Sequence, residues 1–201
     1  ASHRSPSRLF MAGFEECAPT YRIERRSFPF WTLELIAAGM GSFSEMGHPR
    51  SLRHASVFAY GPGVPQRFAN DADRPFRKYF LVSGEQKFPE AWSRAGLSPG
   101  GLLQLRLVGP IVAILDQLLD EGQRTDAQTS EVLTGFETVL YALIARHALS
   151  PRQSESGARE VYELVLDTLQ REFRTIASLG ELAERSGYSG EYICRLFRRY
   201  H

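Results

Sequence analysis

The strongest constraint on the fold lies in segment 178–201, whose sequence is SLGELAERSGYSGEYICRLFRRYH. Ser178 followed three residues later by Glu181 forms a capping box, in which the serine oxygen accepts a free backbone N–H while the carboxylate reaches back along the chain. Gly187 then permits the positive φ of a tight turn. The segment therefore predicts a short helix ending at about Arg185, followed by a tight turn and a second helix.

This second helix is strongly amphipathic. Ser189 is placed to cap it, and we expect it to run from Gly190 to Tyr200. The residues of its apolar stripe are Ile193, Leu196, Phe197 and Tyr200. The residues of its polar and basic face are Glu191, Cys194, Arg195, Arg198 and Arg199. Such a face suits a helix that reads DNA base edges and phosphates, and the alternative is a hairpin with a solvated charged face.

The string LAERSGYSGEYICRLFRRY resembles the first helix-turn-helix of the AraC/XylS family of bacterial transcription regulators. The matching residues are Leu182, Ala183, Gly187, Tyr188, Ser189, Ile193, Arg195, Phe197 and Arg198. The resemblance implies a double-stranded DNA operator as partner. It places Glu191, Cys194 and Arg195 on bases, and it places Arg198 and Arg199 toward the backbone, with Ser189 completing the predicted DNA-binding set.

The resemblance is incomplete at its C-terminal side. DNA modules of this family hold two helix-turn-helices joined by a long helix, and the sequence ends at His201, where that helix is expected to begin. The second helix-turn-helix is therefore expected to be missing. This leaves two alternatives, a piece of a longer regulator or a truncated sensor and dimerisation module without DNA binding.

Composition predicts an ordinary soluble protein. The chain has 201 residues, of which 43% are hydrophobic and 23% charged, and its net charge is +1, so no strong field for nonspecific nucleic-acid binding is expected. The two cysteines, Cys17 and Cys194, lie in different predicted domains, which suggests no disulfide and a reducing compartment. Because no long apolar run or signal peptide is apparent, the predicted location is the cytoplasm, without membrane contact.

Residues 9–88 predict a β domain and give the chain an α+β fold class. Short β-rich runs alternate with turn signals, and six or more such strands suggest a barrel or jelly roll. The predicted strands are 21–27, 31–38, 41–46, 51–60, 66–69 and 76–83. The runs WTLELIAAGMGSF, FAYGPGVPQRF and PFRKYFLVSG are similar to the cupin-type effector-binding barrel of AraC-like regulators, although His54-Ala55-Ser56 replaces the usual Pro-Gly-Asp turn.

The barrel is expected to bind a small-molecule effector in its interior. Strand alternation places Thr32, Glu34, Ile36 and Ala38 on one face, and it places Lys78, Phe80 and Val82 together. Matched to the family's sugar-binding pattern, the candidate effector residues are Ala38, Phe68, Lys78 and Phe80. Glu34 is then expected to point into the same cavity and completes the set. The alternative is that Glu34 and Lys78 are exposed or paired with each other, while Phe68 and Phe80 fill the core.

A cupin-like enzyme acting on a small polar substrate is the other interpretation of such a barrel. It needs two or three histidines and a carboxylate that converge on a metal ion. The five histidines are His3, His48, His54, His147 and His201, and no H-x-H pair occurs. We therefore expect no metal, no cofactor and no catalytic residue, with His54 a strand residue hydrogen-bonded to its neighbours.

Two further helices follow the barrel. Pro110 suits the start of the first helix, and the second is expected over 128–148. Each helix has an apolar stripe wide enough to cover the barrel and still leave an apolar seam for a second copy of the chain. In AraC-like proteins such a pair makes the dimer contact, so the resemblance implies a homodimer. The predicted domains are a barrel (1–100), a helical pair (101–148), a linker (149–158) and the first helix-turn-helix (159–201), which starts with a support helix over 159–173.

Overall fold

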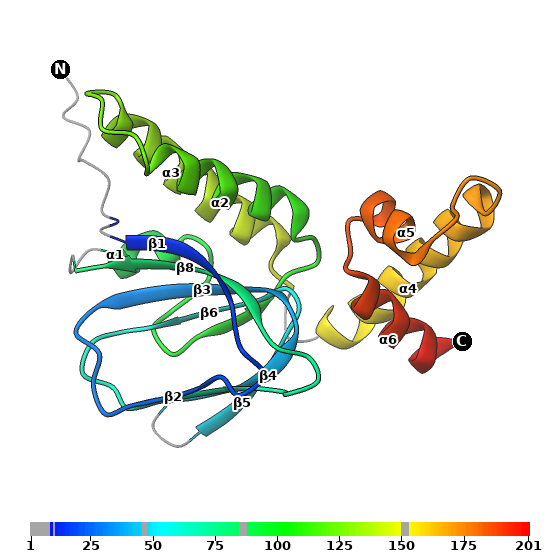
Figure 1. Ribbon diagram of the computed structural model, residues 1–201, viewed down its shortest axis with the longest axis horizontal. Coiled ribbons are helices and arrows are strands. Elements are labelled where there is room, and N and C mark those ends of the chain that lie inside the picture. Colours follow the sequence, from blue (N-terminus) through cyan, green and yellow to red (C-terminus); the bar gives the residue numbers. More distant parts are fainter. Residues whose placement is uncertain (1–8, 10, 46–47, 85–87, 150–152) are drawn as a thin grey trace.

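The computed structural model describes residues 9, 11–45, 48–84, 88–149 and 153–201. It has the predicted α+β class, with two antiparallel sheets facing each other and helices outside them (Figure 1). The five-stranded sheet has the order β1 (Met11–Glu16), β8 (Arg77–Ser83), β3 (Trp31–Ala38), β6 (Ser56–Tyr60) and β9 (Leu102–Gln104). The four-stranded sheet has the order β2 (Arg22–Arg25), β7 (Gln66–Asn70), β4 (Met40–Glu45) and β5 (His48–Arg53).

The predicted strand over 51–60 is wrong, because a turn divides it into β5 and β6. Ala55 has φ +65°, a left-handed conformation that a strand does not contain. His54 therefore lies in a turn between the two sheets, and the prediction that it is a strand residue was also wrong. Its ring donates from Nδ1 to the backbone oxygen of Ala37, at 2.6 Å.

The first and the last strand of the barrel along the chain were not predicted. β1 pairs with β8 over its whole length, and β9 pairs with β6. Because β9 lies beyond residue 100, the barrel extends past the predicted domain boundary.

A β-bulge interrupts the regular alternation of β3. Ile36 stands opposite Lys78, but Ala38 stands opposite Arg77, so the register shifts between Ile36 and Ala38. Side chains that face each other across an antiparallel pair lie on the same side of the sheet. Ala38 therefore shares the side of the exposed Arg77, and the prediction that it shares a face with Glu34 is wrong.

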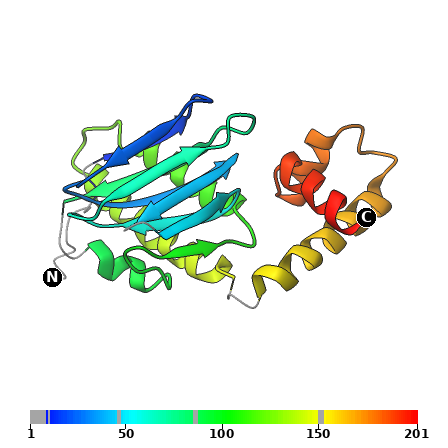
Figure 2. The same ribbon diagram turned by 90° about the horizontal axis from the view of Figure 1, so that it is seen from below.

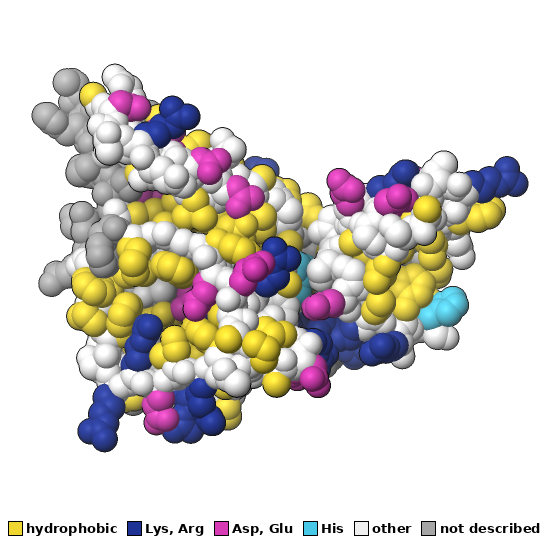
Figure 3. Space-filling view, viewed as in Figure 1, with side chains coloured by type: hydrophobic (Ala, Val, Ile, Leu, Met, Phe, Trp, Pro, Cys, Tyr) yellow, Lys and Arg dark blue, Asp and Glu magenta, His cyan; other side chains and the backbone are white. Residues whose placement is uncertain are grey.

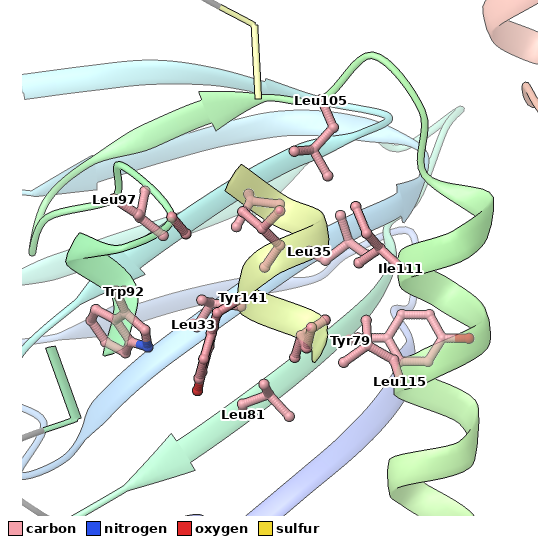
Figure 4. Packing of buried hydrophobic residues seen from close by; sticks show 14 of the residues in the cluster. Leu33, Leu35, Tyr79, Leu81, Trp92, Leu97, Leu105, Ile111, Leu115 and Tyr141 are labelled. Carbon is pink, nitrogen blue, oxygen red and sulfur yellow. The ribbon is translucent and has the colours of Figure 1, made fainter. Parts of the chain in front are cut away.

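The two faces of the five-stranded sheet bury different cores. The face toward the four-stranded sheet encloses an aromatic cluster that includes Phe43, Phe58, Tyr60, Phe68 and Phe76. The outer face is covered by three helices, α1 (Phe88–Ser93), α2 (Gly109–Glu121) and α3 (Thr129–His147). Figure 4 shows this second core, to which the sheet contributes Leu33, Leu35, Tyr79 and Leu81 and the helices contribute Ile111, Leu115 and Tyr141.

The remaining helices form a separate small core beside one end of the barrel (Figure 2). They are α4 (Gln153–Glu172), α5 (Leu179–Ser186) and α6 (Gly190–Tyr200). α4 begins at Gln153 rather than at Arg159, so the segment predicted as linker is partly helical. Residues 150–152 of that predicted linker lie outside the described part of the chain, as do residues 1–8 of the predicted barrel domain.

α5 and α6 occupy the residues that the sequence predicts. Ser178 Oγ accepts from the backbone N–H of Glu181 at 3.2 Å, and Glu181 Oε2 accepts from that of Ala177 at 2.8 Å. Gly187 ends α5 with φ +72°, and Ser189 Oγ caps α6 by accepting from Tyr192 N at 3.2 Å. These short-range hydrogen bonds explain why the helix boundaries follow from the local sequence.

Candidate functional site

A buried group of charges lies between the two sheets. The Lys78 ammonium is 2.8 Å from Glu34 Oε2 and 2.9 Å from Glu15 Oε2. Tyr60 donates from its hydroxyl to the other Glu34 oxygen at 2.7 Å. Lys78 and Glu34 are almost fully buried, whereas the Glu15 side chain is 40% exposed, so the group extends from the interior to the surface.

Burial and mutual attraction set the protonation of this group. Burial alone would lower the pKa of Lys78, but the Glu34 carboxylate and the neighbouring Tyr21 raise it well above its ordinary value. Burial raises the pKa of Tyr21 to about 12, although the Lys78 ammonium works in the opposite direction. Burial, followed by the Glu34 charge, also raises the pKa of Tyr60. At neutral pH the group thus contains one ammonium and two protonated phenols.

The predicted effector residues are only partly brought together. Glu34 and Lys78 meet as an ion pair, and the Lys78 ammonium lies 5.6 Å from the centroid of the half-buried Phe80 ring. Phe68 is 3% exposed and packs in the aromatic core, with its ring 5.0 Å from that of Phe43. Ala38 faces away from the interior because of the bulge. A role in effector binding stays a prediction for all of these residues.

Sequence reasoning missed three members of the buried group. Tyr60 was detectable, because strand alternation places it on the same face as Phe58. Glu15 was missed together with its strand β1, in which no clear alternation marks a face. The centroid of the Tyr21 ring lies 5.4 Å from the Lys78 ammonium. Tyr21 precedes β2, and no pattern in the sequence predicts that its ring lies beside Lys78.

The polar face of α6 forms the second candidate site. Ile193 and Leu196 are buried against the small helical core, which turns the opposite side of the helix outward. That side contributes Glu191, Cys194, Arg195 and Arg198 to a cavity of about 270 Å³. The barrel contributes Gly39, Met40, His54 and Arg74 to the same cavity. Four of the six predicted DNA-binding residues therefore face the barrel.

The other two predicted DNA-binding residues lie elsewhere on α6. Ser189 is the N-cap, and its side-chain oxygen is used in capping. Arg199 is exposed and lies over the Tyr200 ring, at 5.2 Å from the centroid. Figure 3 shows basic side chains gathered where the barrel meets the helical unit.

Electrostatics at this junction disfavour further positive charge. Burial lowers the pKa of His54, and the nearby Arg195 guanidinium lowers it further. Burial and then Arg53 lower the pKa of Arg195, whose guanidinium also lies 5.0 Å from the centroid of the Tyr192 ring. The cavity therefore concentrates positive charge beside the His54 ring, whose pKa is lowered.

No metal-binding group is present within the described residues, since no three His, Cys, Asp or Glu side chains gather there in a suitable arrangement. Across the described helices, none is both long and apolar enough to cross a bilayer.

Comparison with known proteins supports an established family for the barrel. A family model described as the AraC-like ligand binding domain matches residues 10–136. No curated protein sequence matches the chain.

Several solved structures are similar in fold. The AraC-like transcriptional activator CuxR is 13% identical, with 94% of this chain and 70% of that chain covered and a TM-score of 0.50. ToxT from Vibrio cholerae is 9% identical, with 94% of both chains covered and a TM-score of 0.45. A Cupin_2 domain of an XRE family transcriptional regulator from Enterobacter cloacae is 16% identical over 37% of this chain and 81% of that chain, with a TM-score of 0.34.

Proposed function

The chain belongs to the family of AraC-like ligand binding domains, and from this membership we propose that it is a ligand-responsive transcription regulator of AraC type. In this proposal the barrel binds a small-molecule effector and α6 reads double-stranded DNA in the cytoplasm. No catalytic residue is assigned. The observation that carries DNA reading is the division of α6 into a buried apolar side and an arginine-bearing side.

The geometry of α5 and α6 supports DNA reading. The Gly187 turn sets the two helices at an angle, and Ile193 and Leu196 pack against Val161 and Val165 of α4. A helix fixed through one face presents the other as a rigid surface. Once this face of α6 leaves the barrel, Arg195 reads guanine through two hydrogen bonds, and Arg198 and Arg199 bind phosphates.

The charges inside the barrel support a polar effector. Lys78, Glu34 and Glu15 offer both donors and acceptors, and the half-buried Phe80 ring adds an apolar surface beside them. An effector regulates DNA binding only if its affinity differs between two arrangements of the barrel and the helical unit.

Exposed apolar residues on α3 support a homodimer. Val132 and Val139 are 37% and 43% exposed, and their spacing of seven residues places them on one side of the helix. The opposite side of α3 is already used, since Leu140 and Ile144 pack on the barrel. The exposed side is therefore the one available for a second copy of the chain.

Selection of DNA by the intact chain tests the proposal. The chain is incubated with a duplex library of randomised sequence, and bound duplexes are sequenced over several rounds. The expected result is enrichment of one motif, with Arg195→Ala losing preference at one base position. Arg159→Ala is the matched control, because Arg159 is exposed on α4 and paired with Glu163 away from α6. No enrichment above a protein-free selection would contradict the proposal.

A further inference from the structure

We propose that Cys194 is a site of oxidative modification, and that the cavity between α6 and the barrel holds a hydroperoxide against its thiol. The Cys194 side chain is partly exposed and lines this cavity of about 270 Å³. His54 and Arg195 belong to the same lining and supply polar atoms that bind the reagent. The site lies apart from the buried charges of the barrel, because its described lining contains none of those residues.

Two buried nitrogen atoms of opposite character lack partners at this cavity. Within the described residues, neither His54 Nε2 nor Arg195 Nη2 has a hydrogen-bond partner. His54 is 6% exposed, and its Nδ1 donates to the Ala37 oxygen, so Nε2 of the neutral ring carries a lone pair and accepts. Burial lowers the pKa of His54, which favours this neutral ring. A guanidinium nitrogen only donates. Because buried polar atoms are normally satisfied, the two atoms indicate a small ligand that donates to one and accepts from the other.

This pair of atoms selects the class of ligand. A metal cation is disfavoured, because Arg74, Arg195 and Arg198 all line the cavity. A carboxylate has only acceptor atoms and leaves the lone pair of His54 Nε2 unpaired. A hydroperoxide has an O–H donor and two acceptor oxygens, so it donates to His54 Nε2 and accepts from Arg195 Nη2 together. Water offers the same hydrogen bonds, but a hydroperoxide also reacts with a thiol in the same cavity.

The reaction at Cys194 balances without a further reactant. The sulfur attacks the terminal oxygen of the hydroperoxide, an S–O bond forms and the O–O bond breaks. The sulfur is oxidised to a sulfenic acid, and the hydroperoxide is reduced to an alcohol, or to water in the case of hydrogen peroxide. His54 Nε2 orients the terminal oxygen by accepting from its O–H. Arg195 donates to the other oxygen, on which negative charge develops as it leaves, and the thiol proton ends on that oxygen.

The rest of the lining suits a hydroperoxide with an organic body. Met40, Leu179 and Tyr192 add apolar surface beside the polar atoms. Hydrogen peroxide leaves this surface uncovered, whereas an organic hydroperoxide covers it with its hydrocarbon part. Both reagents share the O–O chemistry, and the experiment below distinguishes them.

The second cysteine provides an internal comparison. Cys17 is 8% exposed and belongs to the aromatic core of the barrel. Burial, followed by the Glu15 charge, raises the pKa of its thiol to about 12. Because the thiolate is the reactive form of cysteine, Cys17 is expected to be inert. Oxidation should therefore distinguish two thiols of one chain, with Cys194 the reactive one.

Trapping of the sulfenic acid in the intact chain, without DNA, tests the site. The chain is treated with hydrogen peroxide or cumene hydroperoxide in the presence of dimedone, and peptide mass spectrometry locates the adduct. We expect the adduct at Cys194 and none at Cys17, and the faster of the two reagents identifies the preferred hydroperoxide. Cys194→Ala should abolish the adduct, and Cys17→Ala should retain it. Because dimedone reacts with sulfenic acids, oxidation of Met40 does not contribute.

Rate constants separate this site from an ordinary exposed thiol. Cys194 is expected to react at least about tenfold faster than free N-acetylcysteine at the same pH, and Arg195→Gln should slow it by about tenfold or more, with partial recovery in Arg195→Lys. His54→Phe, which removes the acceptor, should slow it as well. Arg159→Gln is the matched control and should leave the rate unchanged, because Arg159 is exposed on α4 and paired with Glu163.

Three results would each overturn the inference: no adduct at Cys194, a rate equal to that of the free thiol, or an equal rate in Arg195→Gln and the unmodified chain. The second of these is the result expected if water occupies the cavity. Thermal unfolding checks that each variant is folded.

Oxidation has a consequence for DNA that rests on the proposed function. Cys194 lies on the side of α6 assigned to base reading, so a sulfenic acid there adds a polar oxygen to that surface. The affinity for a selected duplex is expected to fall on oxidation and to return when a small thiol reduces the chain, whereas that of Cys194→Ala should be the same before and after treatment. Adduct formation without any DNA binding would contradict the proposed function alone. DNA binding without adduct formation would contradict this inference alone, and unchanged affinity after complete oxidation would remove the regulatory role.

Discussion

The Lys78 ammonium lies 2.8 Å from the Glu34 carboxylate inside the barrel, and both side chains are almost fully buried. On the neighbouring strand positions, Arg77 pairs with Glu16 at 2.9 Å, but there both side chains are more than half exposed. β8 therefore forms a buried ion pair with β3 and an exposed ion pair with β1. Comparing variants of the two pairs therefore separates the effect of burial on stability from the effect of charge on stability.

Removing the buried cation should be strongly destabilising. Lys78→Met leaves Glu34 buried without its counter-charge and is expected to lower the free energy of unfolding by about 3–5 kcal/mol. Arg77→Met should cost about 0–1 kcal/mol, because solvent screens the exposed pair. Urea denaturation measures both. The double variant Lys78→Met with Glu34→Leu should recover much of the loss, and equal costs for the two single variants would contradict the assignment.

The two glycines of α5 should respond to alanine in opposite directions. Gly187 has φ +72° and an added Cβ would lie 3.1 Å from Leu107, so Gly187→Ala is expected to cost about 1–2 kcal/mol. Gly180 is helical, and an added Cβ would make only an ordinary contact, 3.7 Å from Ser178 Oγ, so Gly180→Ala should stabilise by about 0.5–1 kcal/mol. Thermal unfolding of the two variants gives the comparison. Stabilisation by both would show that the turn at Gly187 does not form.

The helices at the C-terminal end were predictable because their signals are local. Each capping hydrogen bond joins residues within four positions of one another, so the sequence around Ser178 and Ser189 determines the boundaries. The amphipathic stripe of α6 likewise follows from its own residues. Most strands of the barrel were predictable for the same reason, from alternation within each strand.

The missed features depend on contacts between distant segments. β9 has three residues and forms a strand because it pairs with β6. The bulge before Ala38 likewise depends on the pairing of β3 with β8. The turn at His54 and Ala55 contains neither glycine nor proline, so no residue type marked it. Nothing in the local sequence relates Arg195 to His54, and their meeting at one cavity arises from the packing of two separate cores. This is why the barrel contact of α6 was not predicted.

His54 should make stability depend on pH. Its pKa is lowered below 6.5 by burial, with Arg195 lowering it and the Ala37 oxygen and Glu191 opposing that shift. The unfolded chain therefore binds the proton more readily, so stability present above about pH 6.5 is lost as pH falls through the lower folded-state pKa. Urea denaturation from about pH 7.5 to 5 should show this loss. His54→Gln should reduce the slope, and an unchanged slope would contradict the assignment.

The exposed side of α3 should determine the oligomeric state. The chain is expected to sediment as a dimer at micromolar concentration, and Val139→Glu should give a monomer because it places a charge in the apolar seam. Leu164→Glu is the matched control, since Leu164 is 50% exposed on α4, outside the seam. A monomeric unmodified chain, or a dimer in Val139→Glu, would contradict the proposed interface.

Base discrimination by Arg195 tests the central claim most directly. The affinity of the intact chain and of Arg195→Ala is measured for a selected duplex and for variants changed at each base pair, at one fixed salt concentration. The account predicts that Arg195→Ala loses about 1–3 kcal/mol of discrimination at a single position, whereas Arg199→Ala weakens binding to all duplexes about equally. Unchanged discrimination at every position in Arg195→Ala would contradict the assignment of α6 as the DNA-reading helix.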